Sequence, residues 1–303
     1  MRSTTRAFNS MNTCRASVDS PHLRYLHLDY HHDDVHPEFL AALTQNFPSL
    51  TELEFTSMHF TSFAQFVQIM ESLPLLRRIS LDKVLFYDRR YGENGENPED
   101  DGPEPSYMPS NLTDVVAHCG YDATAPVLSW LRSQPCTRRL AVAIEPYRRE
   151  EHTTLLSEIL RMLGSRLEHL IIKNADNIHL PDLSLTTGLL TFAMSGIQCL
   201  QTSTSLDLDW VPTLLSQIHS PGLKRIVFVV DLRERTGLDL LDWTRIREFL
   251  AQQRSLRRVQ FYLSAHKKWA TQAIAARLSP RAYALRVGQL EGRYRYSLDM
   301  FDH

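Results

Sequence analysis

Apolar and polar positions alternate in a six-residue pattern that recurs along the chain. Leucine or another apolar residue occupies the first, fourth and sixth positions, and polar residues fill most of the others. Because side chains alternate between the two faces of a strand, each copy predicts a β-strand with one face toward a core. Clear copies span residues 23–28, 50–55, 76–81, 223–228 and 256–261, and weaker ones begin at Leu112, Thr137, Leu167 and Leu189.

The segments between these strands carry helical periodicity. Residues 63–73 place apolar side chains at the three- and four-residue spacings of one helix face. Ser62 is the expected N-cap of this helix, and Pro74 marks its end. Asp209 and Asp242 are expected to cap two further helices in the same way.

Strands and helices that alternate about every 22 to 36 residues predict a leucine-rich-repeat solenoid. We expect an α/β fold with about nine parallel strands on the concave face and helices on the convex face. The Asn or Cys that usually follows the first leucine by eight residues is missing, for example at Met58 and Val84, so we expect an irregular horseshoe. A closed (β/α)₈ barrel would bury the outward strand positions, and many of these are charged. A solvated concave face is therefore favoured, with a binding surface formed by Tyr25, His27, Asp29, Glu52, Glu54, Arg78, Ser80, Asp82, His169, Lys173, Arg225, Arg258 and Gln260.

Three segments fall outside the repeats. The first residues lack apolar periodicity and predict a flexible tail. An internal segment with six acidic residues and no aliphatic side chain predicts a disordered acidic insertion. The last segment shows one helical pattern and two short strand patterns, at 283–290 and 293–298, around a Glu-Gly turn. The expected organisation is a tail at 1–20, a solenoid at 21–264 with the insertion at 91–106, and a capping helix with short strands at 265–303.

Charge is distributed unevenly along the chain. From Lys224 onward there are 16 Lys and Arg against 8 Asp and Glu, a net charge of +8. The whole chain carries −2, so residues 1–223 carry −10. The C-terminal third also interleaves basic with aromatic residues, which suits phosphates and stacked bases. Nucleic-acid binding is the alternative function, through Lys267, Lys268, Arg277, Arg281, Arg286, Arg293 and Arg295 with Trp269, Tyr283, Tyr294 and Tyr296.

The sequence contains none of the common catalytic or cofactor motifs, such as a P-loop, a dinucleotide glycine fingerprint, G-x-S-x-G or H-E-x-x-H. We therefore expect no enzyme activity, no cofactor and no metal. A cluster of histidines and aspartates at 22–36 leaves metal binding open, although no structural-zinc spacing is present. Scattered cysteines, no secretory signal and no long apolar run predict a cytoplasmic or nuclear protein that does not enter a membrane.

The segments 206–228 and 241–263 carry a resemblance to a known family. They read LDLDWVPTLLSQIHSPGLKRIVF and LDWTRIREFLAQQRSLRRVQFYL. These strands and the D-W helix between them resemble the leucine-rich-repeat portion of fungal F-box-type proteins. The resemblance implies a non-enzymatic scaffold for protein-protein interaction, and substrate recognition for a ubiquitin ligase. No F-box is recognisable before the first strand at Leu23, so the ligase adaptor is expected as a partner only if an F-box is supplied elsewhere.

Overall fold

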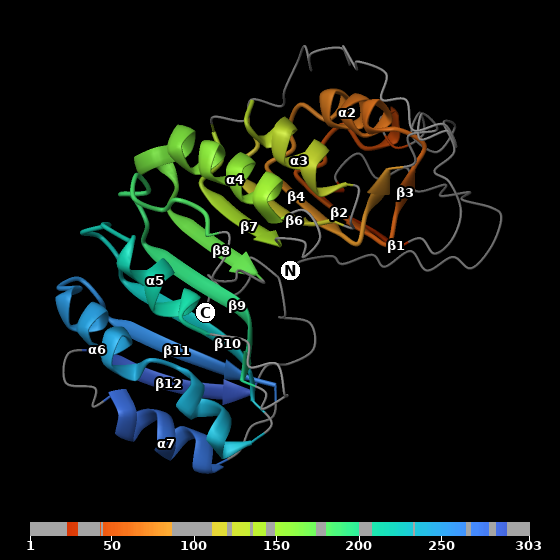
Figure 1. Cartoon of the computed structure of the whole chain (residues 1–303). Helices are drawn as coiled ribbons and strands as arrows, with labels where there is room; N and C mark the ends of the chain where they lie inside the picture. Colours follow the sequence, from red (N-terminus) through yellow and green to blue (C-terminus); the bar gives the residue numbers. More distant parts are fainter. Residues whose placement is uncertain are drawn as a thin grey trace, which may run out of the picture. The chain divides into compact units, whose positions relative to one another are not determined.

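The computed structural model divides into two compact units, residues 1–136 and 137–303, and each unit is described by itself. In both units, parallel strands alternate with helices that lie along one face of the strands (Figure 1). The structure describes residues 23–29, 43, 45–86, 111–119, 123–133, 136–143, 149–173, 180–199, 208–232, 234–264, 268–278 and 283–289.

In the described part of unit 1, the main sheet has four parallel strands, paired in the order in which they occur in the chain. Each strand lies where the repeating pattern predicts it. The inward positions, such as Leu53 and Phe55, are buried, and the outward positions of β2 and β4 are only half-buried. The elements are β1 (Tyr25–Asp29), β2 (Glu52–Thr56), β4 (Arg78–Asp82) and β6 (Asp114–His118), with helices α2 (Phe63–Ser72) and α3 (Thr124–Leu131).

Helix α2 begins and ends as its sequence predicts. The Ser62 side chain accepts a hydrogen bond from the backbone N–H of Gln65 at 3.2 Å. This bond satisfies one of the amide groups that a helix leaves unpaired in its first turn. The helix ends at Ser72, two residues before Pro74. Its buried face, which includes Phe66 and Met70, covers the inward side of the strands.

A small second sheet joins two successive repeats of unit 1. Strand β3 (His59–Phe60) pairs in parallel with β5 (Leu85–Phe86). Ser57 and Lys83, at equivalent positions before these strands, adopt the left-handed backbone conformation, with φ of 53° and 56°. This conformation turns the chain sharply, and the N–H of Leu85 then bonds to the carbonyl of Met58 at 2.9 Å. Here the backbone ladder continues although neither repeat supplies the usual Asn or Cys.

Aromatic rings fill the space between these two sheets and the helices. Phe60 lies 5.3 Å from Phe55 and 6.0 Å from Phe66, measured between ring centroids. Phe66 in turn contacts Trp130 of α3 edge to face at 5.2 Å. Successive repeats thus share one core, which is how a stack of repeats becomes stable.

Unit 2 shows the same alternation, and its described residues form six parallel strands that pair in chain order. Their inward side chains pack against helices; for example, Phe228 stacks on Phe261 at 4.6 Å and Trp243 lies 6.1 Å from Phe261. The strands are β7 (Arg139–Ala143), β8 (His169–Lys173), β9 (Thr191–Cys199), β10 (Arg225–Leu232), β11 (Arg258–Leu263) and β12 (Ala284–Gln289). The helices are α4 (Arg149–Leu163), α5 (Trp210–Ser216), α6 (Trp243–Gln252) and α7 (Lys268–Leu278), and the 3₁₀ turns are η1 (Gly164–Arg166) and η2 (Arg235–Leu240).

The last described strand follows the rule of the earlier repeats. The carbonyl of Arg24 accepts bonds from the N–H groups of Thr51 and Glu52, each at 2.9 Å, and the carbonyl of Arg257 likewise accepts from Ala284 at 2.9 Å. Strand β12, which matches the strand predicted at 283–290, pairs in parallel with β11 and extends the sheet beyond the nine strands expected for the repeats. The second short strand predicted for this end, 293–298, lies outside the described residues, as do the N-terminal tail and the acidic insertion.

Both units are thus mixed α/β structures built on parallel strands, as the sequence predicts. Among the helices that the structure describes, none is long and apolar enough to cross a membrane.

Candidate binding surface

The strand register of unit 1 brings predicted surface residues together on the outward face. Neighbouring parallel strands lie about 4.8 Å apart, so side chains at equivalent positions are in contact range. Tyr25, Glu52 and Arg78 form one row across β1, β2 and β4. The next row along the strands is His27, Glu54 and Ser80. The row after that is Asp29, Thr56 and Asp82.

Glu54 is at the centre of a small hydrogen-bond network on this face. The Tyr25 hydroxyl donates to Glu54 Oε2 at 2.7 Å, and His27 Nδ1 lies 3.4 Å from the same oxygen. The hydrogen bond from His27 is the main cause that lowers the pKa of Glu54; burial opposes it, and the bond from Tyr25 adds to it. Burial first, and the Glu54 carboxylate second, raise the pKa of Tyr25. Glu54 is therefore an anion at neutral pH that holds Tyr25 as a neutral donor.

A second polar pair lies at the carboxyl ends of β4 and β6. His118 Nδ1 is 2.6 Å from Asp82 Oδ1, and the two residues are opposite each other in the register. Asp82 belongs to the predicted surface, but His118 does not. Its place could have been found in the sequence, since it follows Leu112 by six residues, as Asp82 follows Leu76.

The outward face of unit 2 is largely apolar and buried, contrary to the expected solvated surface. At the middle outward position, β7, β8, β9 and β10 carry Ala141, Ile171, Ala193 and Val227, and each is no more than 4% exposed. Burial of apolar side chains lowers the free energy of the folded chain. Where the sequence places no polar side chains at the outward positions, these positions are therefore buried as well. Half-buried His169 and Lys173 lie at the two ends of β8. In the register, Thr191 of β9 separates His169 from Arg225 of β10.

Polar residues return to the outward face at β10 and β11. Arg225 and Gln260 are both buried, and Arg225 Nε donates a hydrogen bond to Gln260 Oε1. Gln260 Nε2 lies 3.5 Å from the Tyr262 hydroxyl on the same strand. Arg258, opposite Arg225 in the register, is exposed. Of the predicted surface residues, Arg225, Arg258 and Gln260 thus form a group of their own.

The three basic residues of the proposed nucleic-acid site that the structure describes do not share one surface. Lys268 and Arg277 belong to helix α7, whereas Arg286 lies on the outward side of β12. Arg277 pairs with Asp239 and lies 5.9 Å above the ring of Trp243. Residues Lys267, Arg281, Arg293, Arg295, Tyr294 and Tyr296 of this set lie outside the described part of the chain.

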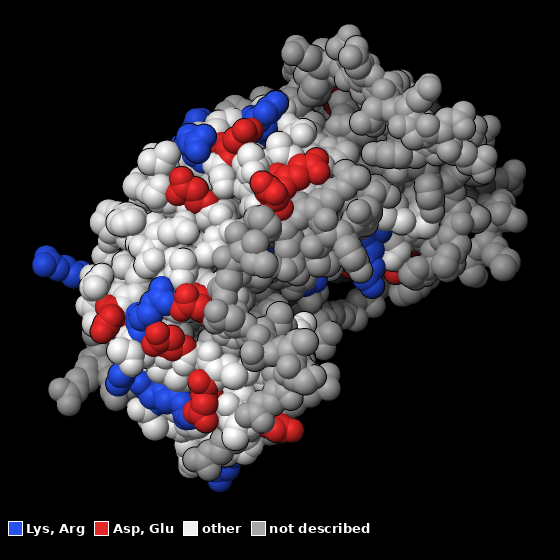
Figure 2. All heavy atoms as spheres, viewed as in Figure 1, with Lys and Arg blue, Asp and Glu red and all other residues white. Residues whose placement is uncertain are grey.

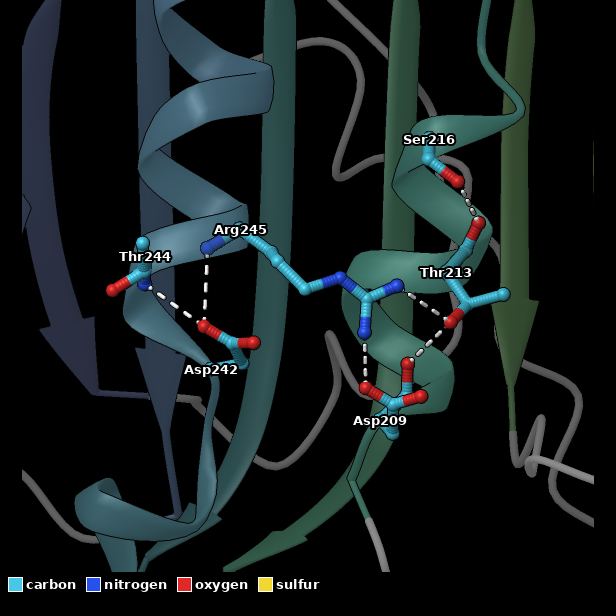
Figure 3. Close-up of polar contacts among 6 residues, drawn as sticks. All are labelled: Asp209, Thr213, Ser216, Asp242, Thr244 and Arg245. Atoms are coloured by element: carbon cyan, nitrogen blue, oxygen red, sulfur yellow. Dashed lines mark hydrogen bonds and ion pairs between the residues drawn. The ribbon is translucent and has the colours of Figure 1, made fainter.

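The helix-bearing surface of unit 2 mixes charges of both signs. Figure 2 shows acidic and basic side chains interspersed there. Between α5 and α6, Arg245 reaches Asp209 and also Thr213, the latter at 3.1 Å (Figure 3). Asp209 occupies the N-cap position of α5, as predicted, but its side chain makes no capping bond, and its carboxylate bonds to Arg245. Asp242 does cap α6, accepting from the N–H groups of Thr244 and Arg245 at 3.0 and 3.1 Å.

No metal centre emerges in the part of the chain that the structure describes. No three His, Cys, Asp or Glu side chains of the described residues gather as metal ligands. His27 is the one described histidine of the predicted cluster at 22–36, and the others lie outside the described residues. Cys199 is buried, and burial raises the pKa of its thiol to about 12. A thiol with that pKa stays protonated and unreactive at neutral pH.

No model of a known protein family matches the sequence. No curated protein matches it either.

Proposed function

We propose that this chain is a non-enzymatic scaffold of the leucine-rich-repeat type that binds a protein partner through the outward face of β1, β2, β4 and β6. The observation that carries the proposal is the row-by-row alignment of polar side chains across these parallel strands. Repeat proteins use such a surface because its side chains point the same way from a rigid backbone.

The contacts within this surface favour binding. Tyr25 and Glu54 are held by their mutual hydrogen bond, and Asp82 is held by His118. Side chains fixed before binding lose less conformational entropy when a partner arrives. Tyrosine is also enriched at protein interfaces, where its ring supplies contact area and its hydroxyl a hydrogen bond.

We propose further that the partner is a substrate of a ubiquitin ligase. This part rests on the resemblance of 206–228 and 241–263 to the repeats of fungal F-box-type proteins. The ligase adaptor is a partner in this proposal only if an F-box is supplied elsewhere. Co-purification of ligase subunits with the chain would support this step. Their consistent absence, while another partner is retained, would remove the ligase step and leave the scaffold.

Charge reversal on the outward face tests the scaffold. We expect Glu52→Lys with Arg78→Glu to abolish capture of partner proteins in a quantitative pull-down, because both residues lie in one row of the surface. The matched control is Glu71→Lys on α2, a half-buried residue of the helix side. Equal capture by the surface variant, the control and the unchanged chain would contradict the proposal. Circular dichroism of each variant excludes loss of the fold as the cause.

A further inference from the structure

Three arginines lie on the outward faces of three adjacent strands in unit 2. Arg225 on β10 is opposite Arg258 on β11, and Arg286 on β12 is opposite Gln260 on β11. Their neighbours Ile226 and Phe228 point to the helix side, where Phe228 stacks on Phe261. The three guanidinium groups therefore share the face opposite to the helices.

The three arginines are close enough to influence one another. Burial is the main cause that lowers the pKa of Arg225, and the positive charges of Arg258 and Arg286 lower it further. The partner that opposes these effects is the Tyr262 hydroxyl, which is a neutral group at physiological pH. Like charges that lie opposite each other on adjacent strands repel one another.

Arg225 is built into this face and is not a mobile surface residue. It is only 7% exposed, and Gln260, which accepts the bond from its Nε, is fully buried. Its Nη2 is buried, and among the described residues no atom accepts a hydrogen bond from it. A buried donor on a charged group without an acceptor costs free energy. Arg258 and Arg286 beside it are exposed, so the group can be approached from solvent.

We propose that Arg225, Arg258 and Arg286 form a site for a phosphate monoester carried by the protein partner. A phosphate monoester has a charge of about −1.5 to −2 and three acceptor oxygens, which suits three guanidinium groups better than a single carboxylate does. Arg225 Nη2 would donate to one phosphate oxygen, while Gln260 fixes the guanidinium plane through Nε. The protein source of the phosphate rests on the proposed scaffold function; the phosphate site itself does not.

Small probes test the site without a partner. The full chain is titrated calorimetrically, at constant ionic strength, with inorganic phosphate and with a blocked tripeptide containing phosphoserine. The same tripeptide with serine or glutamate, and a short thymidine oligonucleotide, are the comparisons. We expect both phosphate probes to bind, and Arg286→Ala or Arg258→Ala to weaken binding about tenfold or more, since each removes one charge-assisted contact. Both residues are exposed, so these variants should fold.

Arg254→Ala is the matched control, because Arg254 is an exposed arginine in the turn between α6 and β11 of the same unit. Its titration should equal that of the unchanged chain. Failure of both phosphate probes to bind would overturn the proposal, as would glutamate peptide binding as strongly as phosphoserine peptide. Tighter binding of the oligonucleotide, lost in the same variants, would assign the site to nucleic acid. If the phosphate probes bind but partner capture in the pull-down is unchanged by Glu52→Lys with Arg78→Glu, the scaffold proposal is rejected and the phosphate site stands.

Discussion

The outward faces of the two units differ, although their strands follow one pattern. In β2 and β4 of unit 1, buried inward residues alternate with half-buried outward ones. In β10 of unit 2, the residues at both kinds of position are buried for most of the strand. The pattern thus fixes only the inward side chains, which must fill the core between strand and helix. The outward side chains are free to differ, and they give each unit its own surface chemistry.

The largest difference between the units should appear when a lysine is placed at the same outward position in each. Val227 of β10 is fully buried, whereas Ser80 of β4 is half-buried beside Glu54. We expect Val227→Lys to cost about 4 kcal/mol, because a buried ammonium loses its hydration. Ser80→Lys should change stability by less than about 1 kcal/mol.

Thermal unfolding of the two variants measures this difference. A cost of about 4 kcal/mol corresponds to a midpoint lowered by roughly 10 °C in a unit of this size. Similar midpoints for both lysine variants would show that the outward faces are equivalent after all.

A smaller effect should separate the two outward hydrogen-bond networks. Gln260→Ala removes the acceptor of buried Arg225 Nε, and we expect a loss of about 2 kcal/mol, typical of a hydrogen bond to a charged group. Glu54→Ala should cost about 1 kcal/mol, because water can replace it around Tyr25 and His27. Denaturant unfolding provides both values. Gln260→Glu, which keeps an acceptor, should recover part of the loss, and a glutamate variant no better than alanine would argue against the network.

The helix sides of the two units should respond alike. Ser62→Ala in unit 1 and Asp242→Ala in unit 2 each remove a capping bond and should each cost about 1 kcal/mol. Asp209→Ala is the control at a position that makes no capping bond; losing its exposed ion pair with Arg245 should cost only about 0.5 kcal/mol. Chemical denaturation of the three variants tests this, and a larger loss for Asp209→Ala than for Asp242→Ala would reverse the assignment.

Low pH should reduce the stability of unit 1, because the Glu54 carboxylate becomes protonated. The pKa of Glu54 in the folded chain lies below its usual value, chiefly because of the bond from His27. Its contribution is present above the unfolded pKa of about 4.3 and is lost as the pH falls through the lower folded value. The stability difference between the unchanged chain and Glu54→Gln should therefore shrink below about pH 4. Urea unfolding at several pH values measures it, and a constant difference would exclude Glu54 as the source.

The smallest effect is expected from deletion of the acidic insertion at 91–106. Its six acidic residues and lack of aliphatic side chains predict that it adds nothing to the core. The thermal midpoint should fall by less than about 5 °C, and limited proteolysis should cut the unchanged chain first within this segment. A larger fall would indicate that the insertion packs on unit 1.

Several features of the fold could be predicted from local sequence. The six-residue pattern located all nine expected strands, because apolar residues at fixed spacing must face a core. The sequence also predicts Ser62 and Asp242 as caps, since a capping bond needs only the residue and the helix that follows it. Asp209 has the same local context but bonds to Arg245 of the next helix, a contact between residues far apart in sequence. Strand β12 was expected, but its parallel pairing with β11 depends on a neighbour that the short pattern does not specify.

The sequence by itself therefore determined the alternation of strands and helices, the inward core positions and the polar residues available to each outward face. Only the tertiary structure decided which of these residues meet. Strand register placed Tyr25 and His27 on one oxygen of Glu54, and brought Arg225, Arg258 and Arg286 to three adjacent strands. The physical reason is the range of the forces involved. Periodicity and capping act over a few residues, whereas burial and charge proximity depend on segments about thirty residues apart that only the stacked backbone brings together.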